Sequence, residues 1–256
     1  MPGLLHDHIA AVTGGGSGIG RAIALGFARE GAGVAALDVN GDTAAQTVAA
    51  IRVAGGVAEA FALDIADRAA CAATAAEVAR RMGPVSVLVN NAGINRRTPF
   101  TGDPAAVIKD WTDIMAVNLD GMFNVTLAFL ATLRATRGRI VNIASVQSFA
   151  HMRTPNSAAY TTAKHGVLGF TRALAAELGK DGVRVNAVGP GLIETPLNEA
   201  ARANNPDIAR LSVERTPLGR TGQPDDVVGP AIFLASDLAA YVTGTIIMAD
   251  GGYRTV

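Results

Sequence analysis

The chain has 256 residues, of which 49% are hydrophobic and 17% are charged. This composition excludes a disordered chain, because such a chain has too little apolar surface to offset its ordering entropy. Basic and acidic residues both number 22, so the formal net charge is zero and provides no attraction to a polyanion. We therefore expect one large α/β domain over residues 1–256 that does not bind nucleic acid.

The start of the chain and its single cysteine favour a cytoplasmic protein. Residues 1–8 lack the basic segment and the apolar run of a signal peptide. No apolar stretch is expected to reach the ~18 residues that a membrane span needs. Cys71 cannot form an internal disulfide, and we expect it to be a small buried apolar residue. The four histidines form no obvious ligand set, so no catalytic metal is expected.

Short apolar runs alternate with amphipathic segments along the chain. The predicted strands cover about 9–13, 34–37, 57–63, 85–89, 139–143, 183–188 and 245–248. The predicted helices cover about 19–30, 42–54, 67–82, 104–136, 158–180 and 225–235. This alternation predicts right-handed βαβ units and a parallel sheet with helices on both faces. The fold class is therefore a doubly wound, Rossmann-like α/β domain, whose ligand lies outside the carboxyl ends of the strands.

A glycine-rich turn follows the first predicted strand. The segment 13–20 reads TGGGSGIG, which fits the pattern TGxxxGxG through Gly14, Gly18 and Gly20. Glycines let the backbone approach a pyrophosphate, and the next helix presents its free N–H groups to the phosphates. The alternative is an ordinary glycine turn.

Asp38 ends the second predicted strand, 18 residues after Gly20. A carboxylate at this place accepts hydrogen bonds from the ribose 2′-hydroxyl of NAD and repels the 2′-phosphate of NADP. The loop residue Ser17 supplies no cation for that phosphate. Both features favour NAD, although Asp38 could also be a simple turn residue.

Tyr160 and Lys164 stand four residues apart in a predicted helix, which places their side chains on one face. An adjacent ammonium group stabilises tyrosinate, so we expect the Tyr160 pKa to fall below its usual value of ~10. Ser145 follows the strand at 139–143. Asn118 is a polar amide inside a long apolar helical segment and could also be a hydrogen-bonded core residue.

Taken together, these motifs resemble those of the short-chain dehydrogenase/reductase family. The resemblance covers about residues 9–252 and rests on the order and spacing of a few short segments. These are TGxxxGxG at 13–20, NNAG at 90–93, Asn118, Ser145, YxxxK at 160–164 and PGxIxT at 190–195. It implies a parallel sheet of about seven strands in the order 3-2-1-4-5-6-7.

The resemblance also implies roles for individual residues. Tyr160 would be the general acid/base, Lys164 would bind the nicotinamide ribose, and Ser145 would hydrogen-bond the reacting oxygen. Asn118 would hold a water molecule in a proton relay behind Lys164. Implied cofactor contacts are Gly14, Ser17 and Ile19 at the pyrophosphate, Asp38 and Asn91 at the adenosine ribose, Asp64 at the adenine, and Ile193 and Thr195 at the carboxamide. Ile65, Pro190, Tyr160 and Lys164 complete the cofactor set.

The predicted substrate is a small polar molecule, such as a sugar, a sugar acid or another hydroxy acid. Loops at the strand ends carry Asn95, Arg96, Arg97, Gln147, His151, Arg153 and Asn156. These groups suit a polyhydroxylated or anionic ligand, unless the arginines are merely solvated loop charges. The predicted substrate contacts are Ser145, Gln147, Arg153 and Tyr160. The segment 146–159 is slightly longer than the family leads us to expect.

The sequence therefore predicts an NAD-dependent dehydrogenase that acts on CH–OH groups. The alternatives are a reductase of 3-oxoacyl carrier-protein substrates and a non-catalytic dinucleotide sensor. We also expect a homotetramer, or failing that a dimer, because the helices at 104–136 and 158–180 carry surplus apolar residues. Examples are Met122, Phe129, Leu133, Leu168, Phe170 and Leu174.

Overall fold

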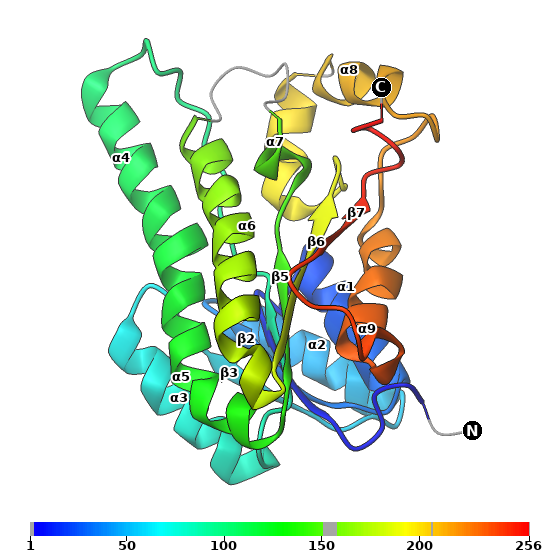
Figure 1. Cartoon of the computed structure of the whole chain (residues 1–256). Helices are drawn as coiled ribbons and strands as arrows, with labels where there is room; N and C mark the ends of the chain where they lie inside the picture. Colours follow the sequence, from blue (N-terminus) through cyan, green and yellow to red (C-terminus); the bar gives the residue numbers. More distant parts are fainter. Residues whose placement is uncertain (1–2, 151–157, 206, 256) are drawn as a thin grey trace.

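The computed structural model describes residues 3–150, 158–205 and 207–255, and it contains one sheet with helices on both faces (Figure 1). Seven strands lie in the order β3-β2-β1-β4-β5-β6-β7. Every neighbouring pair is parallel. The predicted fold class and strand order are confirmed.

The helices and strands have the following bounds. The strands are β1 Ile9–Thr13, β2 Gly33–Asp38, β3 Ala58–Ala62, β4 Val87–Asn90, β5 Arg139–Ile143, β6 Arg184–Pro190 and β7 Ile246–Ala249. The α-helices are α1 Gly18–Arg29, α2 Gly41–Val53, α3 Arg68–Met82, α4 Pro104–Met115, α5 Met122–Ala135, α6 Ala158–Leu178, α7 Pro196–Asn204, α8 Asp207–Glu214 and α9 Val228–Ala235.

The strands supply side chains to two separate cores. In β1, Ala10 and Val12 pack beneath α1, α2 and α9, whereas Ala11 packs beneath α3, α5 and α6. Successive strand residues point to opposite faces of a sheet, so a strand that is covered on both sides has to be apolar throughout. This explains the run at 85–89, which is apolar except for Ser86. It also leaves the carboxyl edge of the sheet as the place where polar strand ends meet.

The predicted helix at 104–136 is a long helical rod with a local change of winding. A π-helical turn, Ala116–Gly121, separates α4 from α5 and contains Asn118. Such turns occur frequently at functional sites. Contrary to the expectation from the sequence, the rod is long and apolar enough to cross a membrane by length and composition alone. Its side chains Val125 and Phe129 are buried in the core of the domain, as in a core helix of a globular fold.

The helices α7 and α8 follow β6 beyond the carboxyl edge of the sheet (Figure 1), and neither was predicted. α7 has nine residues and none of them is buried, so no core contact marks its ends. Its start is instead defined by local capping. Pro196 occupies the first turn, and the Thr195 N–H donates to Asn198 Oδ1 over 3.4 Å.

Candidate active site

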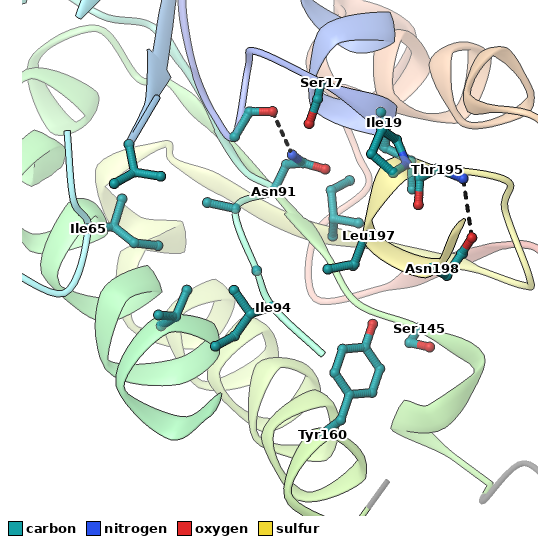
Figure 2. Close-up of a pocket in the computed structure, with 18 of the residues that line it drawn as sticks. Ser17, Ile19, Ile65, Asn91, Ile94, Ser145, Tyr160, Thr195, Leu197 and Asn198 are labelled. Carbon is teal, nitrogen blue, oxygen red and sulfur yellow. Dashed lines mark hydrogen bonds between the residues drawn. The ribbon is translucent and has the colours of Figure 1, made fainter. Parts of the chain in front are cut away.

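A cavity of about 630 Å³ lies at the carboxyl edge of the sheet, where β1, β4, β5 and β6 end. Figure 2 shows side chains that reach it from several of these segments. The predicted residues that line it are Gly14, Ser17, Ile19, Asp38, Asp64, Ile65, Asn91, Ser145, Tyr160, Lys164, Pro190, Ile193 and Thr195. The structure therefore brings every predicted cofactor residue to one cavity.

The glycine-rich turn forms one wall of the cavity. Gly14 and Gly18 have φ angles of +62° and +50°, a backbone conformation that residues other than glycine rarely adopt. A Cβ atom at Gly20 would lie 2.1 Å from the carbonyl oxygen of Gly14, so only glycine lets α1 pack onto the turn. The Ser17 side chain makes no capping hydrogen bond to the start of α1. The N–H groups of the first helical turn are therefore available to an anion.

Asn91 fastens the end of β4 to the glycine-rich turn. Its side-chain amide donates to the carbonyl oxygens of Thr13 and Gly14, over 2.9 and 3.3 Å. Its backbone N–H donates to the Thr13 hydroxyl over 2.9 Å. Figure 2 shows Asn91 reaching the turn from below. Asn91 thus fixes the shape of the turn as well as lining the cavity.

Asp38 holds the same turn from the other side. Its Oδ2 accepts a hydrogen bond from the Gly16 N–H over 2.9 Å, and its Oδ1 accepts one from the Asn40 N–H over 3.0 Å. Each carboxylate oxygen has further acceptor capacity. Asp38 therefore has a structural role in the turn and can still accept hydrogen bonds from a ligand in the cavity.

Asn124, which was not predicted, anchors the wall formed by Ile65 and Ala66. Its side-chain amide donates to the carbonyl oxygens of both residues, over 3.2 and 3.4 Å. Arg68 Nε donates to its Oδ1 over 2.9 Å. The signal in the sequence is the same as for Asn118, a polar amide inside an apolar helical segment.

The side chains of Ser145, Tyr160 and Lys164 converge at one end of the cavity. Ser145 and Tyr160 lie next to each other in Figure 2. Lys164, one turn further along α6, has its Nζ 5.5 Å from the centre of the Tyr160 ring. The Lys164 Nζ donates to the carbonyl oxygen of Ile143 over 2.7 Å, which ties α6 to the end of β5.

The predicted fall in the Tyr160 pKa is wrong for this structure. Burial raises the pKa of Tyr160 to about 12, although the Ser145 hydrogen bond and the positive charge of Arg97 act in the opposite direction. Burial also lowers the pKa of Lys164 to about 8. Lys164 is buried and Tyr160 is half-buried at the cavity wall, and the cost of desolvating the tyrosinate exceeds the stabilisation from neighbouring groups.

Asn118 is buried in the π-helical turn and supports the site from behind. Its Oδ1 accepts a hydrogen bond from the Ile94 N–H over 2.8 Å, and its amide donates to the Ile94 carbonyl over 2.9 Å. Ile94 itself lines the cavity. The contacts fit the alternative of a hydrogen-bonded core asparagine, whereas the role in a water relay stays a prediction.

The predicted substrate residues differ in where they lie. Ser145 and Tyr160 line the cavity. Gln147 is not among the residues that line the cavity. Its side chain is buried, and its Oε1 accepts a hydrogen bond from the Thr161 hydroxyl over 2.8 Å. Arg153, together with His151 and Asn156, lies outside the described residues.

Comparisons with known proteins agree with the motifs. A family model described as enoyl-(acyl carrier protein) reductase matches residues 14–254. Galactitol 2-dehydrogenase (L-tagatose-forming) from Cereibacter sphaeroides is 42% identical over 95% of this chain and 94% of its own. A 3-oxoacyl-(acyl-carrier-protein) reductase from Thermotoga maritima is 38% identical, over 97% of this chain and 98% of its own.

A solved structure extends the likeness to three dimensions. Gluconate 5-dehydrogenase from Burkholderia cenocepacia, crystallised with NADP and tartrate, is 37% identical and has a TM-score of 0.91. The alignment covers 98% of this chain and 97% of that one. The fold and cavity define a Rossmann-like protein with a pocket at the strand ends. The chain belongs to the short-chain dehydrogenase/reductase family and is an oxidoreductase.

Proposed function

We propose that the protein is an NAD-dependent dehydrogenase that oxidises a secondary alcohol of a small polyhydroxylated substrate. The observation that carries this proposal is the shared cavity. The glycine-rich turn and Asp38 form one part of its wall, and Ser145, Tyr160 and Lys164 form another. A dinucleotide bound along the turn would place its reactive end near the tyrosine. We also propose a cytoplasmic location.

The residues present fit a nicotinamide dinucleotide. The cradle at Gly14 and Gly20 would be filled by any Cβ atom, and the start of α1 offers N–H groups to a pyrophosphate. When bound, the oxidised cofactor supplies the hydride acceptor and a positive charge. We place NAD rather than NADP there because the Asp38 carboxylate would repel a 2′-phosphate.

Tyr160 is the proposed general base, and its neighbours make that role possible. Ser145 lies beside Tyr160, which supports the proposal that its hydroxyl hydrogen-bonds the reacting oxygen. Because the pKa of Tyr160 is raised to about 12, mainly by burial, proton transfer at neutral pH requires added positive charge in the site. The Lys164 ammonium, which is protonated below its pKa of about 8, is held one helical turn away.

The proposed substrates are sugar alcohols and sugar acids. Relatives named as galactitol 2-dehydrogenase and gluconate 5-dehydrogenase support this class. The direct experiment incubates the protein with NAD and galactitol or D-gluconate and follows NADH absorbance. NADH formation with either compound supports the proposal.

A reductase of 3-oxoacyl carrier-protein substrates is the second candidate. It is favoured by the 38% identical relative from Thermotoga maritima. NADPH consumption with a 3-oxoacyl thioester, without oxidation of either polyhydroxylated compound, would replace the proposed function by this one.

We further propose a homotetramer, and of the residues named for it from the sequence only Phe170 is used again. Met122, Phe129 and Leu133 are buried in the core of the chain and leave no surplus for a partner. The exposed apolar side chains of the α4–α5 rod are Ile108, Trp111, Phe123 and Leu127. The Phe123 ring also meets Phe170 of α6 edge to face, with 6.4 Å between ring centres, so this apolar surface continues onto α6. A large apolar surface of this kind favours association.

A further inference from the structure

The polypeptide that follows β6 brings Ile193 and Thr195 to the cavity wall and is fastened on one side by Gly222. An isolated parallel bridge joins Ile193 to Gly222. In this bridge the Gly222 N–H donates to the Leu192 carbonyl and the Glu194 N–H donates to the Gly222 carbonyl, each over 2.9 Å. Because successive residues of an extended chain direct their backbone polar groups to alternate sides, the N–H and the carbonyl of Ile193 face away from Gly222.

Asn198, in the first turn of α7, holds the same two wall residues from the other side. Its Nδ2 donates to the Ile193 carbonyl over 2.6 Å, and its Oδ1 accepts a hydrogen bond from the Thr195 N–H over 3.4 Å. Figure 2 shows the bond to Thr195 beside the cavity, which Asn198 also lines. The Ile193 N–H has no hydrogen-bond partner among the described residues. One amide side chain thus fixes two residues of the wall, and one of them offers a donor to a ligand.

Arg202 fixes the orientation of the Asn198 amide. A free asparagine amide can turn by half a rotation and exchange its oxygen with its nitrogen, but a guanidinium group contains only donors. The Arg202 Nε donates to Asn198 Oδ1 over 2.8 Å, so the Nδ2 is left to face the Ile193 carbonyl. Arg202 Nη1 also lies 3.7 Å from Glu194 Oε2, and the Thr221 hydroxyl donates to the other oxygen of that carboxylate over 2.7 Å.

We propose that Asn198 is a positioning residue for the nicotinamide end of the cofactor. By holding Ile193 and Thr195 it keeps the Ile193 N–H in place to donate to the carboxamide oxygen of the nicotinamide. The inference rests on the proposed function, which places the reactive end of a dinucleotide near Tyr160. The proposed contact of the adenosine half is Asp38, at the end of β2, so Asn198 should act on one half of the cofactor only.

The test compares the binding of NADH with that of ADP-ribose, which lacks the nicotinamide. Calorimetry measures the dissociation constant of each ligand for the wild type, Asn198→Ala and the control Asn204→Ala. Asn204 is the last residue of the same helix, is exposed and is not among the residues that line the cavity. Thermal unfolding establishes that each variant is folded.

Asn198→Ala is expected to raise the dissociation constant of NADH by about tenfold, because the Ile193 and Thr195 bonds are both lost. The dissociation constant of ADP-ribose should change by less than about twofold, since its contacts do not depend on these bonds. Asn204→Ala should change neither value by more than about twofold.

The orientation of the amide is tested at Arg202. Arg202→Met keeps the aliphatic stem and removes the donor, so the Asn198 amide can turn round. NADH binding should weaken by about threefold, again without a matching change for ADP-ribose. Arg202→Lys keeps a charged donor and should lie closer to the wild type than Arg202→Met does. An Arg202→Met protein that binds NADH as the wild type does would overturn the part assigned to Arg202.

The outcomes separate this inference from the proposed function. Equal weakening of NADH and ADP-ribose in Asn198→Ala, or unchanged binding of NADH, overturns the positioning role and leaves the dehydrogenase intact. Selective loss of NADH affinity in a protein that oxidises no polyhydroxylated compound overturns the proposed function and keeps the positioning role. For a wild type that binds NADPH instead, the pair becomes NADPH and 2′-phospho-ADP-ribose, with the same expectations. A protein that binds neither dinucleotide contradicts both proposals.

Discussion

The Lys164 ammonium lies 2.7 Å from the carbonyl oxygen of Ile143 and 5.5 Å from the centre of the Tyr160 ring. One buried side chain thus connects the end of β5 to the residue proposed as general base. Burial of the Lys164 ammonium destabilises the folded state at neutral pH, whereas the proposed catalysis requires a buried positive charge beside Tyr160. Lys164 therefore lowers the free energy of unfolding in return for a catalytic role, and the loss of stability can be measured.

Lys164 should make the free energy of unfolding depend on pH. Its pKa is about 8 in the folded protein, below the ordinary lysine value of 10.5 that the unfolded chain keeps, so between these values the unfolded state binds more protons. Stability due to this group then rises with pH, by on the order of 3 kcal/mol at about 1.36 kcal/mol per unit. Urea unfolding of wild type and Lys164→Met from pH 7 to 10.5 measures the difference. The wild type should gain relative to the variant above pH 8. A constant difference would show that burial does not shift the Lys164 pKa.

The cofactor preference should depend on the charge of Asp38. Asp38→Asn removes the charge and keeps one acceptor for the N–H groups of Gly16 and Asn40. We expect the ratio of kcat/KM for NAD to that for NADP to exceed one in the wild type and to fall by about tenfold in Asp38→Asn, or ~1.4 kcal/mol. Steady-state kinetics with one alcohol and both cofactors provide the ratio. A wild type that prefers NADP contradicts the assignment.

Asn124 should act on cofactor affinity rather than on chemistry. Asn124→Ala removes the two hydrogen bonds that hold the carbonyls of Ile65 and Ala66. We expect the dissociation constant of NADH to rise by about tenfold, with kcat at saturating cofactor within about twofold of the wild type. Fluorescence titration gives the dissociation constant. The matched control is Thr132→Ala, whose hydroxyl donates to the Phe129 carbonyl within α5 and to no other described residue. A loss of kcat without a change in NADH binding would contradict this role.

The exposed side of the α4–α5 rod should hold the oligomer together. Replacing Trp111 and Phe123 by glutamate places charges on the proposed contact surface. The core packing should be unaffected, since both side chains are 40% or more exposed. Light scattering at micromolar concentration should give about four times the chain mass of 26.1 kDa for the wild type. The double variant should have a smaller mass. A wild type near 26.1 kDa would exclude both the tetramer and the dimer.

Most of the fold could be predicted because its signals are local. Runs such as 85–89 are apolar on both faces, and glycines mark the turn at 13–20, so the sequence alone indicates a covered parallel sheet. The helix α7 escaped prediction because its nine residues are too few for a clear helical period. The π-helical turn around Asn118 also escaped, since the surrounding sequence keeps an ordinary helical pattern and the winding depends on tertiary contacts.

The location of the site residues could be predicted from the sequence, whereas their pKa values could not. The spacing of Tyr160 and Lys164 correctly places them on one helix, but their burial decides the pKa of each, and a sequence does not give burial. In the same way, Arg96 and Arg97 are equivalent in the sequence. Only the fold pairs Arg96 with Asp113 and leaves Arg97 without an ion pair in the described residues.

The most direct test of the account is the turnover of Tyr160→Phe. Phenylalanine keeps the ring that packs near Lys164 and removes only the hydroxyl. Tyr241→Phe is the control, because that side chain is fully exposed. With NAD and an alcohol that the wild type oxidises, Tyr160→Phe should lose about 10²- to 10⁴-fold in kcat while its NADH dissociation constant and thermal unfolding stay near those of the wild type. A Tyr160→Phe protein that oxidises the alcohol at a rate close to that of the wild type would contradict the proposed mechanism.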